Sequence, residues 1–266
     1  SGGTDVLVQG RIRNKPQTLV NISGLAGLCD INETADTIEI GSGVNFNRIV
    51  EHPAVAEYLP LLANACHTIG SNQIRNRATF GGNIVNAAPC ADSVPPAIIY
   101  DAEVELMLAT EGAFKQRRLP LSEFIKGGYS TDLQAGELLT KIIIPKPNRF
   151  DLVAKYNQLG RRKALNITRL SLTCLIGVDE QGVVDYCRFV DGALFSKPQR
   201  LPAVESVFIG HQITAERVKQ AENVLLDMID SAIGGRWSAA YKQPVFINMF
   251  RNVMDEVSAE LAKGVK

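Results

Sequence analysis

Residues 68–92 read TIGSNQIRNRATFGGNIVNAAPCAD, a stretch of small and polar residues between two apolar segments. Gly81 and Gly82 lack side chains, so the backbone there can come close to a ligand. Successive N–H groups of a tight Gly-containing turn form a concavity that suits an anion, and Thr79 and Asn83 add hydrogen-bonding side chains on either side of the pair. The stretch therefore predicts an anion-binding loop, and the alternative is an ordinary surface loop with a Gly-Gly turn.

A second loop of the same kind opens the chain. Residues 1–5 read SGGTD and precede the apolar residues 6–8. Two such loops on one domain would hold the two phosphates of a dinucleotide from opposite sides. Asp92, nine residues after Asn83, would then accept a hydrogen bond from a ribose hydroxyl.

Composition narrows the functional class. The chain has 266 residues, with 28 basic and 28 acidic side chains and a formal net charge of zero. Binding to nucleic acid needs a basic excess, so it is not expected here, whereas a net charge near zero favours association with other subunits. With 45% hydrophobic residues the chain can bury a core. No run of 18 apolar residues and no signal peptide is present in the sequence.

The residues that usually carry chemistry on their own are scarce. There are three histidines and five cysteines, without a C-x-x-C pair, a metal-ligand spacing or a Ser–His–Asp order. The cysteines therefore read as free thiols in a reducing compartment, which predicts a cytoplasmic protein. A chain with so few catalytic groups suits a protein whose bound cofactor does the chemistry.

Three segments carry a resemblance to a known family: SGGTDVLVQ at residues 1–9, QIRNRATFGGNI at 73–84 and ADSVPPAIIYDA at 91–102. They resemble the FAD-binding medium subunit of molybdenum hydroxylases, the group that contains bacterial xanthine dehydrogenases, nicotinate dehydrogenase and carbon monoxide dehydrogenase. The resemblance extends over nearly the whole chain. The pattern I-R-N-x-A-T-x-G-G-N-I is specific, whereas SGGTD alone is not.

The resemblance implies an α+β flavoprotein in two parts. Residues 1–147 would form an FAD-binding domain of the PCMH type, and residues 148–266 a smaller C-terminal α+β domain with an antiparallel sheet and helices. The sequence pattern agrees, because strands followed by helices in each half favour α+β over a doubly wound sheet, and the Pro-rich residues 144–148 suit a boundary. A Gly-rich phosphate loop normally follows a strand, so we expect roughly 25–35 residues, one strand–helix unit, before Ser1.

The resemblance also implies roles for individual residues. Ile69 would pack against the isoalloxazine ring, with simple core packing as the alternative, and Asp92 would bind the ribose. Since no histidine occurs from residue 71 to 106, FAD would be bound non-covalently. The two pyrophosphate loops would consist of Gly2, Gly3, Thr4 and Asp5 in the first and Thr79, Gly81, Gly82 and Asn83 in the second.

One position departs from the family pattern. In many relatives a Tyr/Phe-Lys-x-x-x-Arg-Arg segment supplies a lysine near the flavin, and here Asn157 follows Tyr156 at that place. A cation would stabilise the reduced, anionic flavin better than an amide does, so the identity of the electron acceptor stays open.

Residues 161–163, RRK, would be a partner-facing basic patch or a solvated turn. Arg75 would have a structural role, paired with a carboxylate.

The function predicted on this basis is electron transfer within a heteromeric complex. A partner subunit with molybdopterin would oxidise a purine, an N-heterocycle or an aldehyde, and a small subunit with 2Fe-2S clusters would pass the electrons to FAD on this chain. The acceptor would be NAD+ or another oxidant. Two alternatives remain: a free-standing FAD oxidoreductase of the same fold, and an FAD-free scaffold that bridges the other subunits.

Hydrophobic patterning and capping signals predict the secondary structure. Helices are expected at residues 48–51 with Asn45 or Asn47 as N-cap, 60–66, 121–125 with Ser122 as cap, 214–233 with Thr214 as N-cap, and 243–262. Strands are expected at residues 18–22, 37–40, 103–108, 114–119, 137–144, 150–157, 170–178 and 183–190.

Overall fold

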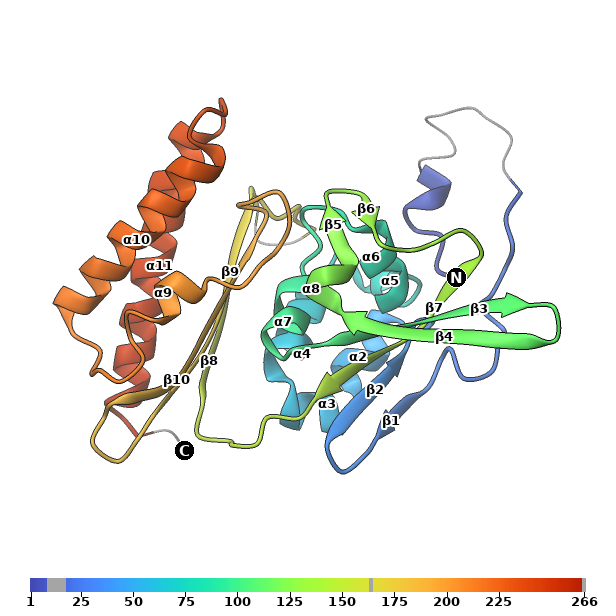
Figure 1. The fold of residues 1–266 in the computed structure, drawn as a ribbon, viewed down its shortest axis with the longest axis horizontal. Coiled ribbons are helices and arrows are strands. Elements are labelled where there is room, and N and C mark those ends of the chain that lie inside the picture. Colours follow the sequence, from blue (N-terminus) through green and yellow to red (C-terminus); the bar gives the residue numbers. More distant parts are fainter. Residues whose placement is uncertain (9–17, 163–164, 265–266) are drawn as a thin grey trace.

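The computed structural model describes residues 1–8, 18–162 and 165–264, and these contain two larger antiparallel sheets with helices around them, besides one two-stranded sheet (Figure 1). The α+β class predicted from the sequence is confirmed. Lys163, the last residue of the basic triplet, lies outside the described residues.

The N-terminal sheet has five strands in the order β1-β2-β7-β3-β4. All neighbours are antiparallel. Strands β3 and β4, both expected from the sequence, form a hairpin in which Thr110 pairs with Ala113 across the turn at Glu111 and Gly112. The strands are β1 (Ile31–Glu33), β2 (Thr37–Gly41), β3 (Glu103–Thr110), β4 (Ala113–Pro120) and β7 (Glu137–Pro145), and a separate pair is formed by β5 (Ile125–Gly127) and β6 (Ser130–Thr131).

Short helices pack against one face of this sheet and bury a core with it (Figure 1). Asn45 caps the first of them as expected, since its side chain accepts from the N–H of Arg48. They are α2 (Phe46–Glu51), α3 (Pro53–Tyr58), α4 (Pro60–Thr68), α5 (Asn72–Arg75), α6 (Phe80–Asn86), α7 (Val94–Ile99) and α8 (Leu121–Phe124).

The C-terminal sheet has the order β10-β9-β8, and it stands between two layers of helices (Figure 1). Helix α11 packs on one face with α10 against it, and α4 and α7 pack on the other face. Every residue of β9 except the last is buried, because the central strand is covered on both sides. The elements are β8 (Val153–Leu159), β9 (Leu170–Val178), β10 (Val184–Gly192), α9 (Pro202–Glu205), α10 (Ala215–Ile233) and α11 (Ala239–Leu261).

Several sequence expectations are corrected. Residues 18–22 form no strand, and the edge strand β1 was not anticipated. The residue before α8 is Pro120 rather than Ser122, and no side chain caps that helix. Thr214 is the N-cap of α10 as expected, since its side chain accepts from the N–H of Arg217, and the helix ends at Ile233.

The largest correction concerns the stretch that was read as a loop. Two helices, α5 and α6, lie inside residues 68–92. Gly81 and Gly82 belong to the first helical turn of α6 and do not form the Gly-Gly loop expected from the sequence. Thr79 is the N-cap of α6, because its side chain accepts from the N–H of Gly82. Short helices with glycine near the start are hard to foresee, since glycine lowers helix propensity and tertiary contacts supply what local preference lacks.

Candidate cofactor site

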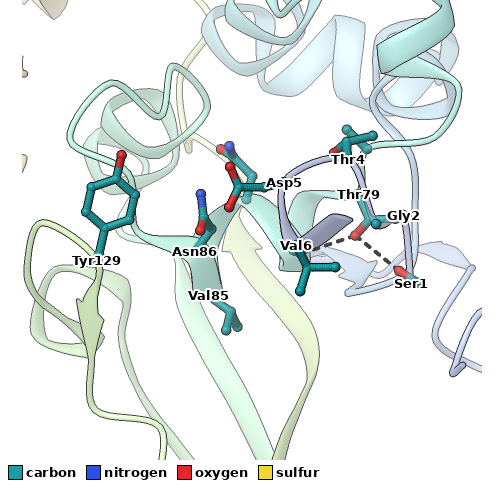
Figure 2. Close-up of a pocket in the computed structure, with 13 residues that line it drawn as sticks. Ser1, Gly2, Thr4, Asp5, Val6, Thr79, Val85, Asn86 and Tyr129 are labelled. Atoms are coloured by element: carbon teal, nitrogen blue, oxygen red, sulfur yellow. Dashed lines mark hydrogen bonds between the residues drawn. The ribbon is translucent and has the colours of Figure 1, made fainter. Parts of the chain in front are cut away.

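The two Gly-containing segments singled out in the sequence lie side by side. Ser1 Oγ donates a hydrogen bond of 3.2 Å to Thr79 Oγ1. Gly2 packs so closely on the backbone before α6 that an added Cβ would lie 2.2 Å from the carbonyl oxygen of Arg77. Only glycine fits such an approach, so the first loop is fixed against the start of α6 (Figure 2).

A cavity of about 770 Å³ opens where these segments meet. Its volume falls in the range of small-molecule and cofactor sites. Among the described residues, Asp5 is the one charged side chain in its lining, so this part of the site would hold an anion by amides and hydroxyls. The lining residues are Ser1, Gly2, Gly3, Thr4, Asp5, Val6, Ala78, Thr79, Gly82, Asn83, Val85, Asn86 and Tyr129.

The first loop supplies backbone donors to the cavity. Gly3 has a φ of +74°, and its carbonyl accepts from the N–H of Leu7 at 3.2 Å. Within the described residues, the N–H groups of Gly3, Thr4 and Asp5 donate to no protein acceptor. Unpaired N–H groups in such a loop form a concavity for an anion, which fits a phosphate group of FAD.

The start of α6 contributes in another way. Its first N–H groups are already used, because Phe80 donates to the carbonyl of Val44, Gly81 to that of Ser42, and Asn83 to that of Thr79. What remains for a ligand is the positive end of a short helix and the side chains of its cap and first turn.

On α6, the side chain of Asn83 lines the cavity and has hydrogen-bond donors that are available to a ligand. Ser93 Oγ donates 2.7 Å to Asn83 Oδ1, so the amide oxygen is occupied. An amide side chain has two N–H donors besides its oxygen, and within the described residues these donors have no acceptor. They are free to donate to a phosphate or ribose oxygen.

Gly81 and Ile69, both assigned to the site from the sequence, lie outside the cavity lining. Gly81 is buried against Ser42, and an added Cβ there would lie 2.4 Å from the Cβ of Ser42. Ile69 is the C-cap residue of α4 and packs on the core. The carbonyl of Ile69 accepts a hydrogen bond from Arg75, which also donates to Asn47 Oδ1. Arg75 therefore has the structural role expected from the sequence. Its acceptors are a side-chain amide and backbone carbonyls, however, and not the expected carboxylate.

Asp92 is buried beneath the C-terminal sheet instead of lining the cavity. Its Oδ1 accepts from the hydroxyl of Tyr156 at 3.0 Å and from that of Thr168. Burial raises the pKa of the Asp92 carboxyl above its ordinary value, and the hydrogen bonds from Thr168 and Tyr156 oppose that rise.

Asn157 lies on the far face of β8 from Asp92. Side chains of a strand alternate between its two faces. Tyr156 points to Asp92, whereas Lys155 pairs with Glu260 and Asn157 donates 3.5 Å to Glu256, both on α11. The alternation therefore keeps Asn157 away from the cavity of the N-terminal unit.

Asn86 and Tyr129 are among the cavity residues that were not assigned from the sequence. Asn86 ends α6, and Tyr129 faces it across the cavity (Figure 2). Tyr129 has a φ of +59°, a conformation that non-glycine residues rarely adopt, and its N–H donates 2.7 Å to the carbonyl of Ala87. The residue as a whole is 65% exposed, so its side chain is accessible to a ligand. The signal in the sequence was weak: a tyrosine directly after Gly127 and Gly128.

Comparison with known proteins identifies the family to which this chain belongs. The model of the FAD-binding domain in molybdopterin dehydrogenase matches residues 1–147, and that of the carbon monoxide dehydrogenase flavoprotein C-terminal domain matches residues 154–257. The chain belongs to this family of FAD-binding oxidoreductase subunits, as the resemblance had predicted.

Individual relatives agree with the family. The chain is 29% identical to the nicotinate dehydrogenase FAD-subunit of Eubacterium barkeri over 97% of its own length and 88% of that protein. It is 28% identical to the carbon monoxide dehydrogenase medium chain of Hydrogenophaga pseudoflava over 98% of its length and 89% of that protein. A solved structure of that dehydrogenase superimposes with a TM-score of 0.86 at 26% identity, covering 97% of this chain and 88% of the other.

Neither a metal site nor a membrane-spanning helix is found among the described residues. In residues 1–8, 18–162 and 165–264, no group of three or more His, Cys, Asp or Glu side chains could hold a metal ion. In the same part of the chain, no helix is both long and apolar enough to cross a membrane.

Proposed function

We propose that this chain binds FAD non-covalently and passes electrons to it within a molybdenum-containing dehydrogenase. The observation that carries the proposal is the junction of the first loop with the start of α6, where unpaired N–H groups and the Asn83 amide face one cavity. FAD, when bound, accepts electrons singly and releases them in pairs.

The pyrophosphate of FAD is the part that fits this junction best. The N–H groups of Gly3, Thr4 and Asp5 would hold one phosphate, and the side-chain amide of Asn83 would donate to the other. Gly2 and Gly82 allow the backbone to come close, and Thr79 keeps both segments in place through Ser1 and Gly82. The carboxylate of Asp5 would repel a phosphate, so we assign this side chain, unlike the backbone N–H of the same residue, to the ribose hydroxyls.

Gly81, Ile69 and Asn157 were also assigned to the FAD site from the sequence, but they do not line the cavity. Gly81 supports α6 through its contact with Ser42. The ring contact of Ile69 and the flavin contact of Asn157 stay predictions, since neither residue lines the cavity.

The partners follow from the family rather than from contacts on this chain. Relatives are named as FAD-binding subunits or medium chains of xanthine, nicotinate and carbon monoxide dehydrogenases. We propose that a large molybdopterin subunit and a small 2Fe-2S subunit complete the enzyme, that NAD+ is a candidate acceptor, and that the complex is cytoplasmic. The boundary between residues 1–147 and 148–266 is part of the same proposal.

The test is purification under native conditions, with a visible spectrum and identification of every co-purifying chain. FAD released by denaturation, together with an iron–sulfur chain and a molybdopterin chain, is the expected result. A colourless protein with the same partners would favour the scaffold. A yellow protein that runs alone and reduces a substrate directly would contradict the subunit assignment.

The acceptor is tested on the intact complex. Reduction with substrate followed by addition of NAD+ should reoxidise the flavin within the time of turnover. If only ferredoxin, a quinone or oxygen reoxidises it, NAD+ is not the acceptor, and the FAD site proposed above is unaffected.

A further inference from the structure

Helix α5 leads directly into the segment on which the first loop rests. The carbonyl of Ile74, inside α5, accepts hydrogen bonds from the N–H groups of Arg77 at 3.0 Å and of Ala78 at 2.7 Å. The carbonyl of Arg77 is in turn the group against which Gly2 packs. The place of the first loop, and of the N–H groups that it offers to a ligand, therefore depends on where α5 lies.

Helix α5 has no apolar anchor of its own. It is four residues long, and none of these residues is buried. Ile74, its one apolar residue, is 41% exposed. A helix of this length is not stable by itself, and helices in proteins usually depend on the burial of an apolar face. Polar contacts with neighbouring elements therefore hold α5 in place.

One side chain of α2 supplies such contacts at both ends of α5. Asn47 Nδ2 donates to Oδ1 of Asn72, the first residue of α5, at 2.6 Å and to Oδ1 of Asn76, its C-cap, at 2.7 Å. Asn47 Oδ1 accepts from Arg75 Nε at 3.1 Å. Both the amide nitrogen and the amide oxygen of Asn47 are thus used between α2 and α5.

Arg75 extends the same network to the turn before α5. Its Nη1 donates to the carbonyls of Ile69 and Gly70 at 3.1 and 3.4 Å. Gly70 has a φ of +50°, which glycine adopts without strain. A planar guanidinium makes several contacts in fixed directions at once, which a lysine does not. The entry to α5, the helix and its C-cap are therefore tied to α2 through Asn47 and Arg75.

We infer that Asn47 and Arg75 are positioning residues for the cofactor: they hold α5 against α2 and thereby set the Arg77 carbonyl that places the first loop toward FAD. The inference rests on the proposed function for the identity of the ligand. Neither Asn47 nor Arg75 lines the cavity. Each acts on FAD affinity through α5 and Gly2 and not by touching the cofactor.

The test compares FAD affinity with stability in the full chain. FAD is removed and titrated back while the quenching of its fluorescence is followed, and thermal unfolding of the FAD-free protein is measured in parallel. Asn47→Ala removes the contacts of that amide with α5, and Arg75→Met replaces the guanidinium by an unbranched apolar side chain. Each is expected to raise the Kd for FAD about tenfold, because a displaced first loop loses about one hydrogen bond to a phosphate.

Asn47→Asp is the conservative variant and should recover binding. The aspartate keeps an acceptor for Arg75, now a charged one, and the amides of Asn72 and Asn76 can turn their N–H donors toward it. The Kd for FAD should stay close to that of the wild-type protein. If Asn47→Asp binds FAD as weakly as Asn47→Ala does, these polar contacts are not what places the first loop, and the inference fails.

Arg118→Met is the matched control. Arg118, on β4, donates from Nη2 and Nε to Glu105 Oε2 at 2.8 and 3.0 Å, and neither residue lines the cavity. The variant should lower the unfolding temperature and leave the Kd for FAD unchanged. If Asn47→Ala and Arg75→Met behave like this control, their role is purely structural and the inference is overturned.

Coupling between the two variants shows whether they act through one network. The double variant should bind FAD little worse than either single variant, because the effects of residues in one network are not additive. If the losses multiply, Asn47 and Arg75 act separately and the inference fails.

Salt dependence separates positioning from direct contact. A guanidinium bonded to a phosphate of FAD would be screened by salt. Arg75→Met would then make binding less sensitive to salt, and Asn47→Ala would leave the Kd unchanged, a result that overturns the inference. Losses of the same size in both variants, at low and at high salt, support it.

A readout in FAD-free protein distinguishes failure of the inference from failure of the proposed function. The backbone amide resonances of Gly2 and Gly3 should shift in Asn47→Ala and Arg75→Met and keep their positions in Arg118→Met. If wild-type protein binds no FAD, the proposed function fails, while these resonances still decide whether the network holds the first loop. Resonances that stay in place in all three variants overturn the inference.

Discussion

The glycine pairs at the two sides of the cavity differ in what their amide groups do. Gly2 and Gly3 lie in an open loop where the N–H of Gly3 has no acceptor within the described residues. Gly81 and Gly82 lie in the first turn of α6, where the N–H of Gly81 donates to the carbonyl of Ser42 and that of Gly82 donates to Thr79 Oγ1. The same dipeptide thus leaves an N–H donor unpaired in one place, within the described residues, and serves internal packing in the other.

The comparison teaches that absence of a side chain serves two purposes. In both pairs an added Cβ would meet protein atoms, the carbonyl oxygen of Arg77 at Gly2 and the Cβ of Ser42 at Gly81. At Gly2 the contact positions a loop whose other face is the cavity, whereas Gly81 is buried in the body of the N-terminal unit. Substitutions at the two pairs should therefore damage different properties.

Gly81→Ala is expected to have the largest effect, and it should act on stability. The added Cβ would lie 2.4 Å from the Cβ of Ser42, and overpacking of this kind costs about 1–3 kcal/mol. Chemical unfolding of the FAD-free protein measures the loss. Gly235→Ala, where an added Cβ meets no atom within 4 Å, is the control and should be nearly neutral. Equal stability of the two variants would mean that α6 is not packed on Ser42.

Gly2→Ala should act on FAD affinity instead. The Cβ would push the first loop away from the carbonyl of Arg77 and move its free N–H groups. The Kd for FAD should rise at least tenfold, about 1.4 kcal/mol, with the free energy of unfolding of the FAD-free protein almost unchanged. Fluorescence titration and chemical unfolding check the two parts. A stability loss as large as that of Gly81→Ala would remove the distinction between the pairs.

Asn83→Asp sharpens the comparison on the α6 side. Ser93 can still donate to the new carboxylate, so the fold is retained, but the two amide donors are replaced by negative charge facing a phosphate. We expect a rise in the Kd for FAD of about tenfold that becomes smaller at high salt, because charge repulsion is screened. Asn32→Asp, on the exposed edge strand β1, carries the same charge change and should leave FAD binding unaltered.

Thr79→Ala is expected to have the smallest effect, spread over both properties. Loss of the N-cap bond to Gly82 costs about 1 kcal/mol of stability, and loss of the bond from Ser1 loosens the first loop. Thr79→Ser keeps the hydroxyl and should recover both the unfolding midpoint and the affinity. Failure of serine to recover them would indicate that the methyl group of Thr79 matters more than its hydroxyl.

Much of the fold was predictable because its strongest signals are local. The apolar run of β9, the hairpin of β3 and β4, and the Thr214 cap of α10 each occupy one continuous segment with clear patterning. Helices α5 and α6 were not predictable by the same means. They are short, α6 contains two glycines, and its first N–H groups are satisfied by Val44 and Ser42, residues far from it in sequence.

The candidate site divides in the same way. Its two Gly-containing segments were recognisable because small residues, threonine and asparagine occur together in each. Tyr129 was not, since its place in the cavity depends on the pairing of β5 with β6 and on a positive φ. Asp92 and Asn157 were recognised as polar residues at family positions, but sequence spacing does not reveal which partner occupies a carboxylate or which face of a strand looks inward.

The sequence alone determined the α+β class, the membership in a family of FAD-binding subunits and the two segments that meet at the cavity, because these follow from local patterning and from contiguous motifs. Only the tertiary structure decided that Gly81 and Gly82 begin a helix, that Asp92 is held by Tyr156 and Thr168, and that Asn157 faces α11. The physical reason is that hydrogen-bond partners and packing distances between segments far apart in the chain exist only after folding has brought those segments together.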